Sequence, residues 1–260
     1  MENKTYNILG GIFLLVVFIA LILTPLHKKS PVVKVAKKLP AFSRRIAVVI
    51  DDWGYNLNNL SIVEQIKQPL TCAVLPGLKN SKPVMQKLYS LGFEIILHLP
   101  MEPKEKYRLE RDTITTVMNA AQIHNILEKD LTSIAFAKGI SNHMGSRVTE
   151  NSRTAALIMT DVKKRNLYFL DSFVTNKSVC SDLAKKIKVR FAKRDVFLDN
   201  SDDPAYIKSQ VLKLKRIAKN QGVAVGIGHD RKNTLLVLKE MLPQLEADGY
   251  KIVFLSEVVR

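Results

Sequence analysis

The chain has 260 residues and a formal net charge of +16 at pH 7. Its composition, with 47% hydrophobic and 25% charged residues, is that of a folded protein and excludes disorder over most of the chain. Because Cys72 and Cys180 lie far apart without a C-x-x-C partner, neither a disulfide scaffold nor a cysteine-based zinc site is expected.

The first 26 residues predict a transmembrane signal anchor. Residues 5–26 carry no charge, and the stretch 8–23 is almost wholly aliphatic. About 20 such residues span the hydrocarbon core of a bilayer. A cleaved signal peptide is the alternative, but its apolar region is usually shorter, and the T-P-L-H-K-K that follows here is a poor cleavage site.

Residues 27–44 predict a basic linker between this anchor and a single domain over residues 45–260. The stretch 27–45 contains seven Lys or Arg residues and no acidic residue, which suits contact with anionic lipid headgroups. Excess positive charge can also indicate nucleic-acid binding. The chain has no zinc-finger spacing and no basic strand interleaved with aromatic residues, so a nucleic-acid partner is not expected.

Within the domain, apolar runs that predict strands alternate with patterns that predict helices. Strands are predicted at residues 46–50, 70–75, 93–97, 135–140, 167–170, 195–198, 223–228 and 251–255. Helices are predicted at residues 58–67, 80–91, 120–131, 152–165, 179–187, 203–220 and 233–247, and the charged stretch 99–116 predicts a long loop. The alternation indicates parallel βαβ units and favours a (β/α) barrel, with a doubly wound open sheet as the alternative.

Polar side chains follow most of these predicted strands. In chain order they are Asp51 and Asp52, His98, Asn142 and His143, Asp171, Asp199, and His229. The carboxyl ends of parallel strands converge on one face, so these side chains are expected to share a site. A single Asp after a strand also commonly caps a helix or forms a turn, and this reading stays open for Asp171 and Asp199.

These residue types suit metal-assisted hydrolysis. The adjacent carboxylates of Asp51 and Asp52 repel each other, so each needs a partner or a metal. Imidazoles together with a carboxylate are a common ligand set for zinc, which leaves a position open for water. A metal-bound water ionises near neutral pH, and an unligated His can protonate a leaving group. The sequence therefore predicts hydrolysis of an amide or ester.

The sequence resembles the divergent polysaccharide deacetylase family in six motifs, which follow in the family's order over about residues 44–258. They are I-A-V-V-I-D-D-W-G-Y, G-F-E-I-I-L-H-L-P-M-E-P, S-N-H-M-G-S-R-V-T, L-Y-F-L-D-S, R-D-V-F-L-D-N and V-G-I-G-H-D. This family is a distant branch of the NodB-like carbohydrate esterases. The resemblance implies a distorted (β/α) barrel of about seven strands and removal of N-acetyl groups from a glycan with a divalent metal.

The resemblance also implies a substrate, a cofactor and a location. We expect an N-acetylated envelope polysaccharide such as peptidoglycan as the substrate, and zinc as the metal, with cobalt, nickel or manganese as alternatives. The family implies a periplasmic domain anchored in the inner membrane. The basic residues after the apolar segment favour the opposite orientation, because positive residues usually stay on the cytoplasmic side.

Residue roles follow from the motifs that match. The resemblance implies that Asp51 is the catalytic base, that Asp52 and His98 bind the metal, and that His229 is the general acid. It further implies that Asp171 orients this His.

The sequence departs from the NodB-like pattern at the third metal ligand. The second His of the family's motif, four residues after the first, is replaced here by Glu102, and N-H-M-G-S-R replaces the Arg-Pro-Pro-Tyr loop. We predict that His143 supplies the missing imidazole, with Glu102 as an alternative ligand or as a carboxylate that supports a His. Further candidates to support the site or contact substrate are Asn142, Ser146 and Asp199.

These departures keep other functions open. A glycan- or partner-binding module of the envelope that has lost turnover is the main alternative. A metal hydrolase that acts on a different amide or ester is the third hypothesis, because the fold and its motifs do not fix the substrate.

Overall fold

The computed structural model describes residues 44–260. The predicted signal anchor and the linker up to residue 43 lie outside this part of the chain. Between residues 44 and 260 no helix combines the length and apolar character needed to cross a membrane.

A single parallel sheet organises the fold. Its strands are β1 (Arg45–Trp53), β2 (Thr71–Val74), β3 (Glu94–Met101), β4 (Gly139–Met144), β5 (Tyr168–Asp171), β6 (Phe191–Lys193), β7 (Val196–Phe197), β8 (Val223–His229) and β9 (Lys251–Val253). The helices are α2 (Leu60–Val63), α3 (Ser81–Ser90), α4 (Ala120–Ser133), α5 (Ser146–Glu150), α6 (Ser152–Lys164), α7 (Cys180–Ile187), α8 (Pro204–Gln221) and α9 (Lys232–Ala247). A 3-10 turn, η2 (Leu255–Glu257), follows β9.

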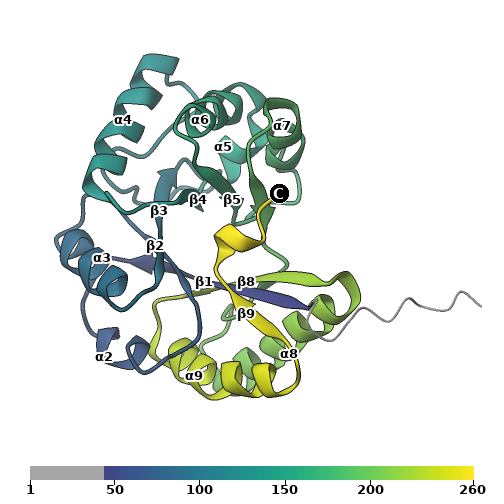
Figure 1. Cartoon of the computed structure of the whole chain (residues 1–260). Helices are drawn as coiled ribbons and strands as arrows, with labels where there is room; N and C mark the ends of the chain where they lie inside the picture. Colours follow the sequence, from purple (N-terminus) through teal and green to yellow (C-terminus); the bar gives the residue numbers. More distant parts are fainter. Residues whose placement is uncertain (1–43) are drawn as a thin grey trace, which may run out of the picture. The chain divides into compact units, whose positions relative to one another are not determined.

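The sheet curves into an incomplete barrel. Its strand order is β6-β5-β4-β3-β2-β1-β8-β7, and β9 pairs with the first half of β1. No ladder between β6 and β7 closes the ring within the described residues. Figure 1 shows the long helices arranged around the outside of the curved sheet. The predicted parallel α/β architecture is thus confirmed, and the distorted barrel of about seven strands expected from the family takes the form of a half-barrel.

The two faces of the sheet carry different apolar cores. Along β1, Ile46, Val48 and Ile50 belong to the large core between the sheet and the helices. Ala47 and Val49 alternate with them and face a smaller core on the other side. That smaller core contains strand residues and the C-terminal segment but no residue of an α-helix. Because helices cover only one face, the doubly wound sheet does not describe this fold.

The fourth strand was predicted four residues too early. Residues 134–136 form a turn after α4, and the strand begins at Gly139 rather than at residue 135. The strand is buried yet polar, since Ser141, Asn142 and His143 are all buried. The prediction followed the apolar run and missed a strand that is held by its neighbours β3 and β5. The structure also adds β6 and α5, which the sequence did not predict.

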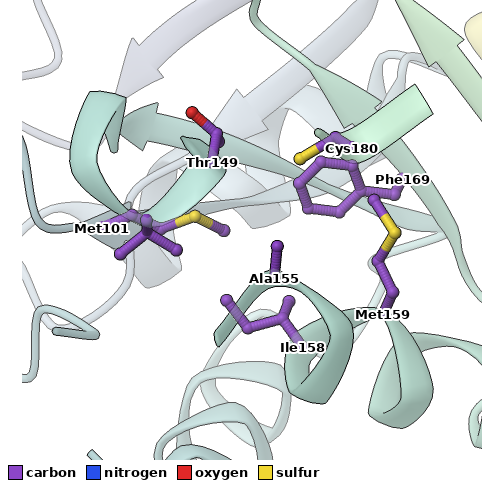
Figure 2. A pocket seen from close by; sticks show the side chains of 8 residues that line it. Met101, Thr149, Ala155, Ile158, Met159, Phe169 and Cys180 are labelled. Carbon is purple, nitrogen blue, oxygen red and sulfur yellow. The ribbon is translucent and has the colours of Figure 1, made fainter. Parts of the chain in front are cut away.

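The apolar gap shown in Figure 2 lies in the large core. Its lining includes Met101 of β3, Phe169 of β5, Ile158 of α6 and Cys180 of α7. The gap has no room for a water molecule. It is therefore a feature of core packing and not a binding site.

Candidate active site

A bulge at the end of β1 turns two adjacent carboxylates toward the same imidazole. The pairing of β1 with β2 shifts register between Ile50 and Trp53, and Asp52 has a φ of 66° in the left-handed region. In a regular strand, successive side chains point to opposite faces. Here Nε2 of His98 lies 3.2 Å from Oδ1 of Asp52 and 3.7 Å from Oδ2 of Asp51.

Asp52, His98 and His143 converge from β1, β3 and β4. The Nδ1 atom of His143 lies 3.0 Å from Oδ1 of Asp52, and the two imidazole centroids are 5.0 Å apart. One donor atom from each of the three residues lies within 4.8 Å of the others. These are the residues that the sequence predicted as metal ligands, and their separation suits a shared cation.

The electrostatics of the three residues also fit a divalent cation. Burial lowers the pKa of His98 to about 4, so its imidazole is neutral, as a metal ligand must be. Burial alone would raise the pKa of Asp52, but hydrogen bonds from His143 and His98 outweigh it and hold the pKa below its ordinary value. For His143, burial opposes protonation, yet the bond to Asp52 raises the pKa. A bound cation would take the place of that extra proton.

Asp51 lies beside this group with an uncommitted oxygen. Asp51 is only 2% exposed, and its Oδ1 is buried without a hydrogen-bond partner in the described part of the chain. Burial, and then the nearby charges of Asp52 and Asp199, raise the pKa of Asp51. An orphaned buried carboxylate oxygen normally has a ligand, ion or catalytic explanation, and this one lies next to a cluster that suits a metal.

His229 lies on the strand next to Asp51, where β1 and β8 pair in register. Oδ1 of Asp199 accepts a hydrogen bond from Nδ1 of His229 at 2.8 Å. Burial would raise the pKa of Asp199, but its bonds with His229 lower it, so the carboxylate stays ionised and can only accept. Nδ1 therefore carries a proton, and Nε2 is the nitrogen free to exchange a proton with a ligand. The ring of Phe197 stacks on this imidazole, with centroids 5.5 Å apart.

The expectation that Asp171 orients His229 is wrong in this structure. The carboxylate of Asp171 accepts hydrogen bonds from the backbone N of Phe173 and from Oγ of Ser178, both at 2.7 Å. It orders the turn after β5. Asp199 orients the imidazole instead, because the sheet places β7 beside β8 and leaves β5 on the other side of β1.

Glu102 is also outside the cluster of predicted ligands. Its Oε2 accepts hydrogen bonds from the backbone N and Oγ1 of Thr116, and its Oε1 lies 3.1 Å from Nε of Arg147. These contacts hold the loop between β3 and α4. Glu102 therefore does not replace the missing His in this structure, and His143 occupies the place beside Asp52.

Asn142 and Ser146 support the backbone around the site. Asn142 Oδ1 accepts a hydrogen bond from the backbone N of Ser172, which ties the end of β4 to the segment after β5. Ser146 Oγ accepts a hydrogen bond from the backbone N of Lys104 in the loop after β3. Neither side chain belongs to the Asp-His-His group.

Four residues near the site were missed by the sequence analysis. Ser141 Oγ lies 2.7 Å from Nδ1 of His98, and Oε2 of Glu110 lies 3.4 Å from Nε2 of His143. The hydroxyl of Tyr55 donates a hydrogen bond to Glu110. Arg194 lies over the Phe197 ring and donates to two carbonyl oxygens after β5. Ser141 lies two residues before His143, a spacing that places both on one face of a strand. The predicted fourth strand ends at residue 140, so this spacing gave no signal.

A family model identifies the class of protein that carries this fold and strand-end site. A model of the divergent polysaccharide deacetylase family matches residues 48–259, and the chain belongs to this family. This match confirms the family that the six motifs indicated.

Two relatives with substantial sequence identity carry no assigned activity. The uncharacterized protein YibQ of Escherichia coli K12 is 34% identical over 209 residues, which cover 80% of this chain and 66% of that protein. An uncharacterized protein of Haemophilus influenzae is 32% identical over 204 residues, which cover 78% of this chain and 73% of that protein. The chain therefore spans about two thirds of the length of the first relative.

Solved structures share the fold. The uncharacterized protein ATU2773 of Agrobacterium tumefaciens superposes with a TM-score of 0.80 at 24% identity, covering 83% of this chain and 89% of that one. The Bc1960 peptidoglycan N-acetylglucosamine deacetylase has a TM-score of 0.56 at 15% identity, covering 84% and 89%. BA3943 of Bacillus anthracis, described as a CE4 family pseudoenzyme, has a TM-score of 0.51 at 13% identity, covering 83% and 65%.

Proposed function

We propose that this chain is a metal-dependent hydrolase that removes N-acetyl groups from a cell-envelope glycan such as peptidoglycan. The observation that carries the proposal is the convergence of Asp52, His98 and His143, with Asp51 and His229 paired across β1 and β8 beside them. Membership of the divergent polysaccharide deacetylase family supports the reaction class. The Bc1960 deacetylase shows that this fold can carry such chemistry.

The side chains divide the chemistry between them. Asp52, His98 and His143 would hold a divalent cation, of which zinc suits the donor set and cobalt, nickel and manganese are alternatives. Such a cation polarises an amide carbonyl and makes water a better nucleophile. Asp51, with its uncommitted Oδ1, accepts the proton of the attacking water.

His229 completes the reaction as the proton donor. Asp199 fixes the imidazole with its proton on Nδ1, so Nε2 of the imidazolium can protonate the leaving amine. The glycan would then leave with a free amino group and acetate as the second product.

We further propose that residues 1–26 anchor the chain in the inner membrane and that the domain lies on its outer side. The uncharged segment 5–26 is long enough to span a bilayer, and an envelope glycan is accessible only from that side. The basic stretch 27–45 would lie near anionic headgroups. Protease added to intact spheroplasts should digest the domain, and protection from the protease would contradict this orientation.

Release of acetate tests the enzymatic function. The purified chain, loaded in turn with zinc, cobalt, nickel and manganese, should deacetylate peptidoglycan fragments or chito-oligosaccharides. Asp51→Asn should lose this activity. Lys185→Asn, which changes an exposed side chain on α7, is the matched control and should retain it. Absence of acetate from every glycan, with metal bound and the fold intact, would contradict the proposal.

A glycan-binding module without turnover is the second candidate. The departures from the NodB-like motifs, with Glu102 in place of the usual His and N-H-M-G-S-R in place of Arg-Pro-Pro-Tyr, favour it. This function predicts that a glycan binds with equal affinity to the wild-type chain and to Asp51→Asn, while neither releases acetate. An acyl-substrate panel separates both candidates from a hydrolase of another amide or ester.

A further inference from the structure

The loop between β3 and α4 places a carboxylate against the outer edge of His143. Glu110 lies in this loop, and its Oε2 is 3.4 Å from Nε2 of the imidazole. The Glu110 side chain is 14% exposed, so it is largely withdrawn from solvent. This arrangement differs from that of an ordinary loop carboxylate, which would point into water.

A second loop holds this carboxylate in place. The hydroxyl of Tyr55, in the segment between β1 and α2, donates a hydrogen bond of 2.7 Å to Oε1 of Glu110. Oε1 is thereby occupied, which leaves Oε2 directed at His143. Two segments that are far apart in the sequence thus meet at Glu110, whose other oxygen faces the ring nitrogen of His143.

The ring nitrogen itself needs a partner. Nε2 of His143 is buried and forms no hydrogen bond with any residue between 44 and 260 at its present geometry. A buried polar atom without a partner carries a free-energy cost. Oε2 of Glu110, 3.4 Å away, can relieve this cost once the carboxylate and the ring are oriented for a hydrogen bond.

We propose that Glu110, held by Tyr55, positions His143 as a metal ligand by accepting a hydrogen bond from its Nε2. The inference rests on the metal-binding role of the proposed function. A neutral imidazole has one N–H, so a proton kept on Nε2 leaves the lone pair on Nδ1, the nitrogen that faces Asp52. Carboxylates commonly support metal-bound imidazoles in this way.

The other imidazole has a comparable partner. Nδ1 of His98 lies 2.7 Å from Oγ of Ser141, and its Nε2 faces Asp52. The two ligands therefore use opposite ring nitrogens toward the cluster, and each has a polar group behind it. Glu110 adds a negative charge that the hydroxyl of Ser141 does not, so it also strengthens the field that attracts a cation.

Metal affinity tests the assignment without reference to turnover. The full-length chain is titrated with zinc against a competing chelator, as wild type, Glu110→Leu, Glu110→Gln and Tyr55→Phe. We expect Glu110→Leu to weaken zinc binding by about 10- to 100-fold. Glu110→Gln should weaken it less, because the amide oxygen still accepts. Tyr55→Phe should weaken it by about 3-fold, since one hydrogen bond that holds Glu110 in place is lost.

Glu105→Gln is the matched control. Glu105 lies in the same loop, and its Oε2 contacts Ser146 rather than a His. Its zinc affinity should stay within about 2-fold of wild type, as expected for a change remote from the ligands. Circular dichroism checks that each variant folds. If Glu110→Leu does not fold, Glu110→Gln still tests the assignment.

Imidazole proton–nitrogen NMR supplies a readout that a merely structural role would not move. The zinc-loaded wild type should show a protected Nε2 proton on His143. This signal should broaden or vanish in Glu110→Leu, while the signals of His98 stay unchanged.

Two results would overturn the inference. Wild-type zinc affinity in Glu110→Leu would remove Glu110 from this role while leaving the proposed function intact. A folded wild-type chain that binds no zinc, cobalt, nickel or manganese would overturn both together.

Discussion

Asp51 and His229 are direct neighbours across the β1–β8 ladder, at the carboxyl ends of both strands. The proposed base and the proposed acid are thus fixed to the same rigid pair of strands. Asp51 also contacts His98, whereas His229 is held from behind by Asp199. The two proton-transfer groups therefore differ in what holds them, and substitutions can separate their roles.

Asp51→Asn should abolish hydrolysis while the metal stays bound. The amide cannot accept the proton of water, and loss of a general base lowers kcat by about 100-fold or more. The ligand set of Asp52, His98 and His143 is untouched, so metal content measured by elemental analysis should equal that of the wild type. Loss of metal in this variant, with circular dichroism unchanged, would contradict the division of roles between the two carboxylates.

Asp199→Asn should lower kcat by about 10- to 100-fold, with little change in KM, because the orientation and charge of His229 matter most in the transition state. The control is Thr234→Val, which removes the bond from Thr234 to Oδ2 of Asp199 but leaves the bond between Oδ1 and the imidazole. Steady-state kinetics should show a much smaller effect in the control. Equal losses in both variants would indicate a general disturbance of the β7–β8 region.

His143→Ala should release the metal, whereas Glu102→Gln should retain it. His143 lies beside Asp52, while Glu102 is engaged by Thr116 and Arg147. We expect about one ion per chain in the wild type and in Glu102→Gln, because the three-residue ligand set is complete in both. Elemental analysis measures the metal content of each variant. Metal retained in His143→Ala but lost from Glu102→Gln would make Glu102 the third ligand.

Asp130→Asn should stabilise the protein at pH 8 but not at pH 4. Asp130 is buried in α4, and burial, with the nearby charge of Asp112, raises its pKa to about 7. A carboxyl whose pKa is raised in the folded state stabilises the protein below its ordinary pKa and loses that contribution as the pH rises through about 7. The gain at pH 8 should be about 1–3 kcal/mol in the free energy of unfolding.

Urea unfolding at both pH values measures this difference. Asp182→Asn, on the exposed side of α7, is the control and should change stability at neither pH. An Asp130→Asn variant with the same gain at pH 4 and pH 8 would show that the carboxyl is not protonated preferentially in the folded state.

The sequence predicted the parallel architecture because long apolar runs and helical periods alternate regularly. It also predicted that Asp52, His98 and His143 lie together, since polar residues after parallel strands share one face. Their role as candidate ligands came from the family resemblance for Asp52 and His98, and for His143 from the departure at Glu102. It misplaced β4, because that strand owes its position to pairing with β3 and β5 and not to apolar residues. The apolar run before it, at residues 134–137, forms the turn after α4 and the residue that follows this turn.

The partners of the site residues were harder to predict. The choice of Asp171 over Asp199 as the partner of His229 required the strand order, which no local pattern contains. Only the position of β7 beside β8 brings Asp199 to the imidazole. Glu110 lies in a loop without regular structure, where hydrophobic periodicity gives no direction for a side chain.

The direction of β1 has a consequence for how the molecule can be attached to a surface. The described chain enters the sheet at Arg45, and Asp51 lies six residues further on, which in an extended strand is on the order of 20 Å. A link made on the N-terminal side of Arg45 therefore joins the barrel at the end opposite its reactive carboxylates. If the domain were coupled to a solid support through its N-terminus, its reactive end would face away from the support. Bulky, insoluble polymers could then reach the reactive carboxylates and serve as test substrates for the immobilised domain.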